Sequence, residues 1–580
     1  MAEAVGTLTL SGRQAQKSSE PVRVDRALLI FWIAAAAYLI LAVLSVLALN
    51  MMPGDSLSRV AIAQRVIFSR DPHLAAVGFV WNPLQTLPLV PLVPLRLVWP
   101  DVVRLGFAAS LVSVAFMAGA VYQIHAILRD FGVRLLPRVL LTAVFALHPM
   151  ILYYAVNGMS EAMLLFFLLI AVRQLGNWLR SRETLRLVYA GLALGIAYFS
   201  RYEALAPAAA AVLLVLLISW LRSRGQALDR MAAALSDTVI IGLPVAAAFI
   251  FWALASWIIV GQPFEALTSA YGNAVHMQVA QYQRVAAAVE YSQGWLPATT
   301  LAFRRMLTLE PFLLVLLFVA AVQIFRRRAH DAVVPLAVFG AVLLFMLGAY
   351  LRGTIFGDLR YFIAVIPVAT LLIGALLPGR QPRPPVARPL LVSSRPPGRL
   401  VSIGTSALLI GLAMASLPIS AVGMSDRTVA PTQSDELSPV FNFVHHPGAG
   451  LVALRRNVTE RAVAHAVDAL QLGSGKVLLD VFVGYPIVLY SDRPTQFVIP
   501  SDRDWRVAIS DPSADGVEYF LVPSPTNPLA ALDDLNRTYP GIFETGAGIG
   551  QPVATFPGIG HSGAWRLFRV VSYATAESGP

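Results

Sequence analysis

Acidic and basic side chains stand close together in one loop that follows the first long apolar run of the chain. This loop, residues 50–102, holds Asp55 and Asp71, with Arg59 and Arg70 close to them. A carboxylate with a raised pKa can act as a general base toward a hydroxyl group, and a guanidinium binds phosphate through paired hydrogen bonds. The residue types therefore predict proton abstraction beside an anionic ligand. The alternative is structural, because Gly-Asp-Ser and Asp-Pro are also ordinary turn and helix-cap sequences.

Other polar residues stand where apolar segments begin or end. Glu161 begins a long apolar run, and Arg201, Arg352 and Arg360 adjoin apolar runs at the ends opposite to most arginines. Carboxylates at the level of a membrane are costly and usually functional, so these residues are candidates for the same site. Two structural alternatives remain: a glutamate stabilises a helix N-terminus, and arginines at helix ends extend toward lipid headgroups.

The segments that would position these residues are membrane helices. Of the 580 residues, 57% are hydrophobic and only 13% are charged, with a mean hydropathy of +0.67. These values exclude an ordinary soluble globular protein, and the apolar runs are long enough to cross a hydrocarbon core of ~30 Å. The net charge of +11 comes mainly from arginines in short loops, where they indicate topology. Membrane lipids are therefore expected partners, and nucleic acid is not.

The apolar runs predict about eleven transmembrane helices and a multi-pass protein of the plasma membrane. A basic tail, residues 1–26, is expected in the cytoplasm because cytoplasmic segments carry the excess of Lys and Arg. The predicted spans of the membrane domain, residues 27–424, are 27–49, 103–128, 137–156, 160–178, 186–200, 205–221, 237–260, 309–325, 332–350, 362–378 and 401–423. This count places the loop of residues 50–102 outside the cell. The stretch Leu84–Trp99 is apolar but rich in proline, and we expect it to lie on the surface or to be re-entrant.

From about residue 425 the composition becomes that of a soluble domain. Four β-type runs (KVLLDVFV, TQFVIP, VEYFLVP and WRLFRVV) alternate with two helical stretches (NVTERAVAHAVDALQ and NPLAALDDLNRTY). This alternation predicts an extracytoplasmic α/β domain over residues 425–580. Gly546, Gly548 and Gly550 do not lead from a strand into a helix, so a dinucleotide site is not expected there.

Several motifs together resemble one family of membrane enzymes. A Gly-Asp after the first span is followed by SLSRVAIAQRVIFSRD and then by VWNPL; further along come NGMSEAMLLFF, GLALGIAYFSRYEAL and RYFIAVIP. Their order and sidedness resemble the GT-C membrane glycosyltransferases, in particular the bacterial relatives of protein mannosyltransferases and aminoarabinose transferases. The resemblance covers residues 27–378. The chain departs from the family pattern at Asn82, where a proline is common.

The resemblance implies a GT-C-like fold and a transfer reaction in cell envelope biogenesis. Such enzymes move a sugar, here a pentose or hexose, from a polyprenyl-phosphate carrier to an extracytoplasmic glycan, lipid or protein, generally with inversion. By position, Asp55 would be the catalytic base and Glu161 a second acidic residue, with Asp71 as a further catalytic candidate. The carrier phosphate would be bound by Arg201, Arg352, Arg360 and Arg59.

Two questions stay open at the level of sequence. No cofactor is certain, although a divalent cation could stabilise the phosphate in place of arginine. A transporter or flippase of lipid-linked sugars is the alternative function. A transporter should show repeat-related halves and polar residues near the middle of the bilayer, whereas this chain shows no clear repeat and keeps its charges at one face.

Overall fold

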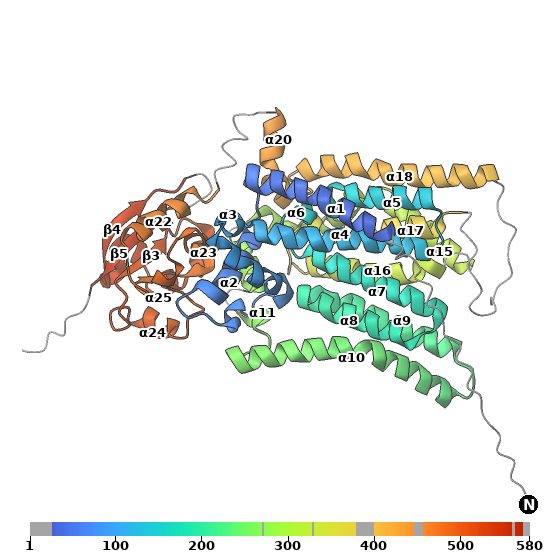
Figure 1. The fold of residues 1–580 in the computed structure, drawn as a ribbon, viewed down its shortest axis with the longest axis horizontal. Coiled ribbons are helices and arrows are strands. Elements are labelled where there is room, and N and C mark those ends of the chain that lie inside the picture. Colours follow the sequence, from blue (N-terminus) through green and yellow to red (C-terminus); the bar gives the residue numbers. More distant parts are fainter. Residues whose placement is uncertain are drawn as a thin grey trace, which may run out of the picture.

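The computed structural model describes residues 26–269, 272–282, 284–326, 330–378, 399–445, 456–559 and 563–571. Long helices run side by side in one bundle, and a smaller domain with a five-stranded sheet lies at one end of it (Figure 1). We call the described residues from 456 onward the sheet domain. The predicted fold class, a polytopic helical membrane protein with a small C-terminal sheet domain, is confirmed.

Each of the eleven predicted spans falls on a helix, because each apolar run is long enough to form one. Within the described ranges, eight helices are long and apolar enough to cross a membrane, or up to ten if each of two bent pairs is one span, while α8 is shorter. The helices of the bundle are α1 (Arg26–Ala42, continued by the π-helical η1, Val43–Ala48), α4 (Phe107–Asp130), α5 (Leu135–Leu147), α6 (Pro149–Val156), α7 (Glu161–Ser181), α8 (Thr184–Ser200), α9 (Leu205–Arg222), α10 (Ala227–Val260), α14 (Trp295–Leu309), α15 (Leu313–Phe325), α16 (Val333–Leu351), α17 (Val365–Leu376) and α18 (Arg399–Ser425).

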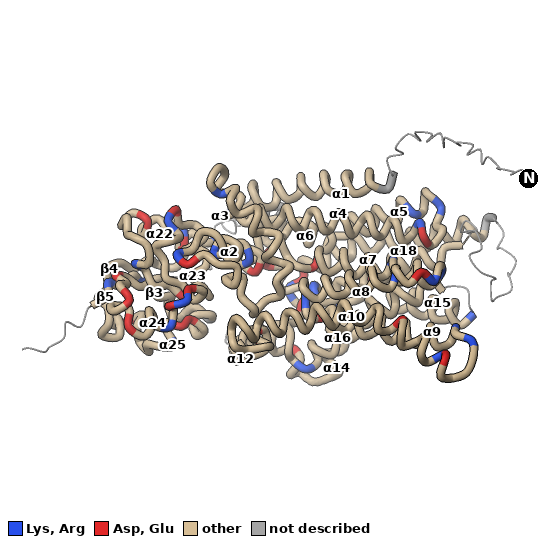
Figure 2. Tube along the Cα trace, turned by 60° about the horizontal axis from the view of Figure 1, so that its bottom comes forward, with Lys and Arg blue, Asp and Glu red and all other residues tan. Residues whose placement is uncertain are grey.

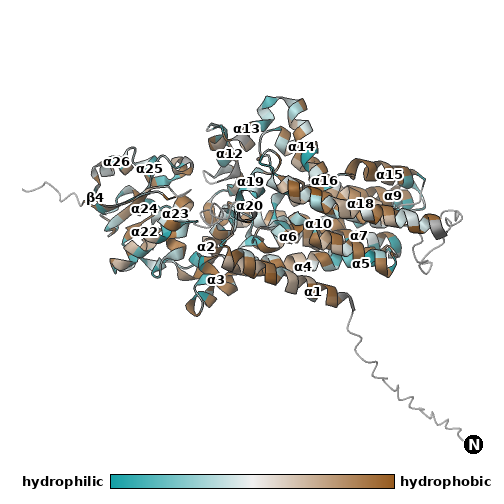
Figure 3. Cartoon of the chain, turned by 90° about the horizontal axis from the view of Figure 1, so that it is seen from above, coloured by the Kyte–Doolittle hydropathy of each residue, from teal (hydrophilic) through white to brown (hydrophobic). Residues whose placement is uncertain are grey.

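The hydropathy of the surface agrees with a bundle surrounded by lipid. Figure 3 shows apolar residues over the outside of α1, α9, α15 and α18, and large side chains such as Trp32 and Phe318 are exposed there. Charged residues lie mainly at the end of the bundle away from the sheet, in the sheet domain, and in a group between them (Figure 2). Burial in lipid suits such a surface, since every backbone group of a helix is paired internally.

Two bends in the bundle meet at one buried polar contact. The pair α5 and α6 bends by 60° and the pair α14 and α15 by 83°. His148 lies at the first bend, where its side chain caps α6 by accepting a hydrogen bond from the Met150 amide (3.3 Å), and its Nε2 lies 3.1 Å from the Leu309 carbonyl at the second bend. Ser420 of α18 donates to the same carbonyl (3.1 Å). The carbonyl freed where α14 ends therefore has partners that lipid could not supply.

The loop of residues 50–102 is compact and largely helical. It contains α2 (Gly54–Phe68), η2 (Leu74–Val77), η3 (Pro83–Gln85), η4 (Leu87–Leu97) and the start of α3 (Asp101–Arg104). The proline-rich stretch forms the 3₁₀ helix η4, with Pro91 and Pro94 inside it and Leu89 and Val93 buried. The short helix η3, which precedes η4, is held to the end of α8, because Asn82 donates to the Tyr198 carbonyl and Gln85 donates to the Ser200 carbonyl (2.6 Å).

The long loop after α10 and the segment after α18 add short helices at the same end of the bundle. The loop contains α11 (Glu265–Thr268), α12 (Asn273–Tyr282), α13 (Ala286–Val289) and η6 (Glu290–Gln293), and the segment contains α19 (Pro431–Glu436) and α20 (Ser438–His445).

The sheet domain has the predicted α/β character. Its strands are β1 (Val477–Leu478), β2 (Phe497–Val498), β3 (Tyr519–Pro523), β4 (Gly550–Phe556) and β5 (Trp565–Val570), in the order β2-β1-β3-β5-β4. β1 pairs in parallel with β2 and β3, and β5 pairs antiparallel with β3 and β4. Its helices are α22 (Val458–Ala469), α23 (Val481–Tyr490), α24 (Trp505–Ser510), α25 (Asp534–Thr538) and α26 (Ile542–Thr545), with η9 (Pro494–Gln496), η10 (Pro528–Leu532) and η11 (Gly546–Gly548).

Two details of the sheet differ from the sequence prediction. The run KVLLDVFV is only a strand in its first part, because Asp480 accepts a hydrogen bond from the Phe482 amide (2.8 Å) and begins α23. β4 was not among the predicted strands. It begins at Gly550, contains Pro552, and is shifted in register between Pro552 and Ala554, so its sequence lacks the regular alternation of a strand.

Candidate active site

Charged side chains from four separate parts of the chain meet between the helix bundle and the sheet domain. Asp55 is the second residue of α2, Glu161 begins α7, and Arg201 follows α8. Arg360 lies in η8 (Leu359–Phe362), just before α17. Each of these residues lies at or near the end of an apolar helix. Because the helices run side by side, their ends place the charged residues at the same end of the bundle.

Arg201 bridges two buried carboxylates. Its Nη1 donates to Glu161 Oε1 (2.6 Å) and its Nε donates to Glu203, in η5 (Tyr202–Ala204). Glu161 and Glu203 are only 1% and 2% exposed. Burial alone would lower the pKa of Arg201, but the two carboxylates outweigh it and hold the pKa above its usual value. Arg201 was predicted to bind phosphate, but in the structure its guanidinium forms ion pairs with Glu161 and Glu203.

Arg360 pairs with Asp55. Its Nη1 donates to Asp55 Oδ2 (3.4 Å) and its Nη2 to the Tyr361 hydroxyl (3.1 Å). The Arg360 amide donates to Asp358 Oδ1 (2.9 Å), which fixes the start of η8. The Nε of Arg360 is buried and has no hydrogen-bond partner among the residues that the structure describes. The Arg360 guanidinium therefore has an N–H group beside Asp55 that can donate a hydrogen bond to a ligand.

Asp55 is ionised rather than poised at a raised pKa. Desolvation acts to raise its pKa, but the charges of Arg360 and Arg59 outweigh it and the pKa lies below its usual value. The expectation of a raised pKa was therefore wrong. The Asp55 side chain remains 45% exposed, so a ligand hydroxyl can approach the carboxylate.

Arg59 is a buried cation that takes part in none of the ion pairs within the described chain. It lies four residues after Asp55, on the same face of α2, and is 3% exposed. Its Nη1 donates to the sulfur of Met159 (3.6 Å), its guanidinium lies 5.6 Å from the ring centre of Trp81, and its Nε has no hydrogen-bond partner in the part of the chain described. Burial lowers its pKa to about 10, opposed by the charges of Asp55 and Glu161. Such a cation is costly without an anion, which makes it the strongest candidate ligand for a phosphate.

The two remaining predicted site residues lie elsewhere. Asp71 faces the sheet domain, where its carboxylate pairs with the Arg503 guanidinium (3.3 Å) and accepts from the Arg503 amide (3.3 Å). Arg352 is exposed at the end of α16. The structure thus brings Asp55, Glu161, Arg201, Arg360 and Arg59 together and does not bring Asp71 or Arg352 to them.

Three residues near Asp55 were missed from sequence. Tyr485 of α23 donates from its hydroxyl to the carbonyl of Gly54 (3.2 Å). His276 of α12 is close enough for the charge of Asp55 to raise its pKa, although burial has the larger effect and lowers it. Glu436 at the end of α19 also lies near Asp55. Each is more than 200 positions away along the chain, so no local signal could have identified it.

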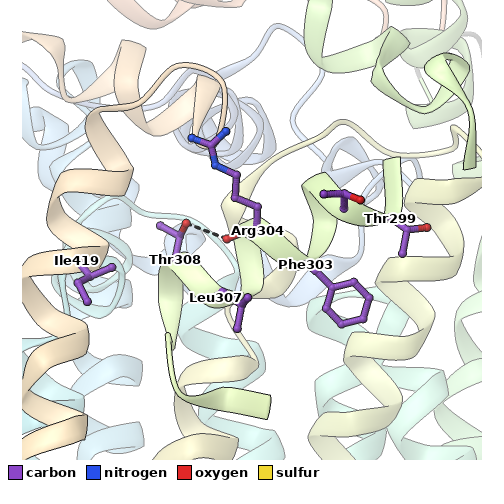
Figure 4. A pocket seen from close by; sticks show the side chains of 7 residues that line it. Thr299, Phe303, Arg304, Leu307, Thr308 and Ile419 are labelled. Atoms are coloured by element: carbon purple, nitrogen blue, oxygen red, sulfur yellow. Dashed lines mark hydrogen bonds between the residues drawn. The ribbon is translucent and has the colours of Figure 1, made fainter. Parts of the chain in front are cut away.

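Two cavities differ in their relation to these residues. One of about 10 Å³, with room for about one water, is lined by Glu161, Arg201, Glu203, Arg360 and Tyr361 at its polar end and by apolar side chains of α7 and α16 elsewhere. A larger, open pocket of about 500 Å³ lies between α14 and α18 (Figure 4). Its threonines, Thr299, Thr300 and Thr308, donate to carbonyls of their own helix. The threonine hydroxyls of the larger pocket are therefore used within the helix. The small cavity, in contrast, adjoins the charged cluster.

The carboxylates of the cluster do not form a metal centre. Glu161 and Glu203 bind Arg201, and Asp55 binds Arg360. Among all residues that the structure describes, no group of three His, Asp or Glu side chains has the arrangement of metal ligands. The arginines are thus the groups in this site that fit a phosphate.

Comparisons with known proteins were made at the levels of sequence and structure. No family model and no curated protein matches the chain. The fold is similar to that of ArnT from Cupriavidus metallidurans bound to undecaprenyl phosphate, with a TM-score of 0.49, 13% identity, and coverage of 96% of this chain and 100% of that one. It is also similar to the oligosaccharyltransferase AglB from Archaeoglobus fulgidus in complex with an inhibitory peptide and a dolichol-phosphate, with a TM-score of 0.41, 12% identity, and coverage of 86% and 69%.

A further structure of the Archaeoglobus fulgidus oligosaccharyltransferase, in complex with Zn and sulfate, gives a TM-score of 0.39 at 10% identity, covering 85% of this chain and 68% of that one. These structures are of the GT-C kind that the sequence motifs resemble, and two of them contain undecaprenyl phosphate or dolichol-phosphate. With TM-scores below 0.5, they indicate a similar fold and not the activity of this chain.

Proposed function

We propose that the chain is an inverting glycosyltransferase that moves a pentose or hexose from a polyprenyl-phosphate carrier to a hydroxyl group of an extracytoplasmic glycan, lipid or protein. The observation that carries this proposal is the position of Asp55, an ionised and partly exposed carboxylate, beside Arg360 and the unpaired Arg59. A base for the acceptor and cations for the leaving phosphate are the two requirements of such a transfer.

In the proposed reaction, Asp55 accepts the proton of the acceptor hydroxyl, and the hydroxyl oxygen attacks the anomeric carbon of the sugar. The bond from that carbon to the phosphate oxygen breaks as the new glycosidic bond forms on the opposite face. The polyprenyl phosphate leaves as an anion. Arg59 and Arg360 stabilise the charge that develops on its oxygens, a contribution that is typically about 10²–10³-fold in rate for one donor.

The other charged residues support this arrangement. Glu161, predicted as a second catalytic acid, is better described as a positioning residue, because together with Glu203 it holds Arg201. Arg201 shares the wall of the small cavity with Arg360, and its charge is balanced by these two carboxylates. Asp71 has its role at the contact with the sheet domain. Arg352, exposed at the end of α16, is expected to bind lipid headgroups rather than the phosphate of the donor.

Turnover in liposomes tests the proposal. The full chain is reconstituted and supplied with undecaprenyl phosphate carrying labelled mannose or arabinose, and release of undecaprenyl phosphate is measured together with transfer of the label. We expect Asp55→Asn to abolish release while binding of undecaprenyl phosphate is retained. The matched control is Asp71→Asn, an aspartate of the same loop outside the cluster, which should retain turnover.

Two results would overturn the proposal. Asp55→Asn could turn over donor within twofold of the unmodified protein, in which case Asp55 is not the base. Labelled donor could instead cross the bilayer intact without being cleaved, which is the behaviour of a flippase.

A further inference from the structure

The sheet domain contacts the helix that carries Asp55 along most of its length. Tyr485 of α23 reaches the first residue of α2 through the Gly54 carbonyl, and Gln64, near the other end of α2, donates to the Val488 carbonyl (3.2 Å). Figure 1 places α23 beside α2, on the side of the sheet domain that faces the bundle. The two helices therefore pack as one unit although more than 400 residues separate them.

The Gly54 carbonyl is a sensitive point of contact. The carbonyl oxygen of residue 54 and the nitrogen and Cα of Asp55 lie in one rigid peptide plane. A hydrogen bond that fixes this oxygen therefore restricts the direction in which the Asp55 side chain leaves the backbone. Pro53, the residue before the helix, makes no side-chain cap, so the start of α2 depends on contacts from elsewhere.

Those contacts come from the sheet domain. Besides Tyr485, Arg456 donates from Nη1 to the Met52 carbonyl (2.9 Å), two residues before Gly54. The Tyr485 hydroxyl keeps its proton, because burial and the nearby charge of Asp55 both raise its pKa. It is thus a permanent donor toward Gly54, whatever the charge state of the site during turnover.

We infer that the sheet domain completes the active site and that Tyr485 is a positioning residue for the catalytic base. Its hydroxyl holds the Gly54–Asp55 peptide so that the carboxylate points between the arginines and the incoming hydroxyl. The inference rests on the proposed function for its consequence in turnover, but the position of Asp55 can be tested without turnover.

The absence of cysteine from the chain makes that test direct. In an Asp55→Cys variant the introduced thiol is the only one, and its reaction rate with an anionic methanethiosulfonate reagent reports its exposure and its distance from the arginines. We expect Tyr485→Phe in this background to change the rate at least fivefold. The control is Tyr490→Phe on the same helix, whose hydroxyl accepts from Asn457 and Arg461 within the sheet domain (3.3 Å each) and should leave the rate within twofold.

Turnover supplies a second readout. Tyr485→Phe with Asp55 intact should lower kcat about tenfold for undecaprenyl-phospho-mannose or undecaprenyl-phospho-arabinose and leave the Kd of undecaprenyl phosphate within twofold. Docking of the sheet domain is measured separately, with thiols introduced through Asp71→Cys and Arg503→Cys. The yield of the crosslink between these thiols should be the same in Tyr485→Phe as with Tyr485 intact. Equal thiol rates for Tyr485→Phe and Tyr490→Phe would overturn the assignment of Tyr485 as a positioning residue, as would a lower kcat of Tyr485→Phe that is accounted for by a lower crosslinking yield. Failure of the proposed function would appear differently, as turnover that survives Asp55→Asn.

Discussion

Replacing Arg59 by methionine tests whether this arginine binds a ligand or stabilises the fold. Arg59 is 3% exposed, and its polar contacts within the described protein are one to the sulfur of Met159 and one to the face of Trp81. Methionine is also unbranched and adapts to irregular packing. The substitution therefore removes a buried, unpaired charge and keeps most of the volume.

Opposite effects on ligand binding and on folding follow from this environment. A hydrogen bond to a charged group contributes about 1.5–3 kcal/mol, and each 1.4 kcal/mol is a factor of ten in affinity. The Kd for undecaprenyl phosphate should therefore rise about 10- to 150-fold in Arg59→Met. The free protein should be as stable as before or more stable, because the cost of burying an unpaired charge exceeds a cation–π contact of about 0.5–2 kcal/mol.

Both quantities can be measured on the same samples. Protein in nanodiscs is titrated with undecaprenyl phosphate to obtain Kd, and its thermal midpoint is recorded without ligand. Arg352→Met is the matched control, because Arg352 is an exposed arginine at the end of α16, and it should change neither value. An unchanged Kd together with a lower midpoint in Arg59→Met would show that Arg59 serves packing, and it would refute the assignment of a phosphate site.

Three further predictions concern charges around the site. Arg201→Met should destabilise the fold by about 3–5 kcal/mol, since it leaves two buried carboxylates without their cation, and denaturant unfolding of the solubilised protein measures this; a loss below about 1 kcal/mol would contradict the buried bridge. Burial raises the pKa of Glu436 to about 8, so the folded state holds a proton that the unfolded state has already released. Stability should then fall as pH rises from about 4.5 to 8, and Glu436→Gln should flatten the dependence of the thermal midpoint on pH over this range, whereas an unchanged slope would argue against a raised pKa of Glu436. Asp71→Asn should weaken docking of the sheet domain by less than about 1 kcal/mol, because Arg503, its ion-pair partner, is 75% exposed and such pairs contribute little; limited proteolysis of the protein should change little, and a large increase in cleavage would contradict a weak ion pair.

The helices of the bundle could be predicted from sequence because hydrophobicity and length determine them locally. Residues at the ends of these helices, such as Glu161 and Arg360, were placed correctly near one level for the same reason. The pairing of Arg201 with Glu203 could not be foreseen, because it depends on the extended backbone of Arg201 between α8 and η5, which turns the two side chains toward each other.

Contacts between distant segments account for the rest of what the sequence did not reveal. Tyr485 and Gly54 meet only because the sheet domain folds back on α2, and neither residue carries a signal for the other. The same holds for the bent helix pairs, where the His148 contact with Leu309 depends on two bends that meet. Asp71 was a plausible catalytic residue by type and by loop, and only the position of Arg503 shows that it belongs to the contact with the sheet domain.

The proline-rich helix η4 has a consequence for how the site responds to the bilayer. A 3₁₀ helix rises about 2 Å per residue, so its 11 residues reach about 22 Å from η3, which is held by α8. At its end, Leu97 and Val98 are 75% and 83% exposed and are followed by Trp99, the type of residue that anchors at a membrane interface. We therefore expect the thickness and headgroup composition of the surrounding leaflet to affect the loop that carries Asp55, so that turnover depends on the lipid as well as on the substrates.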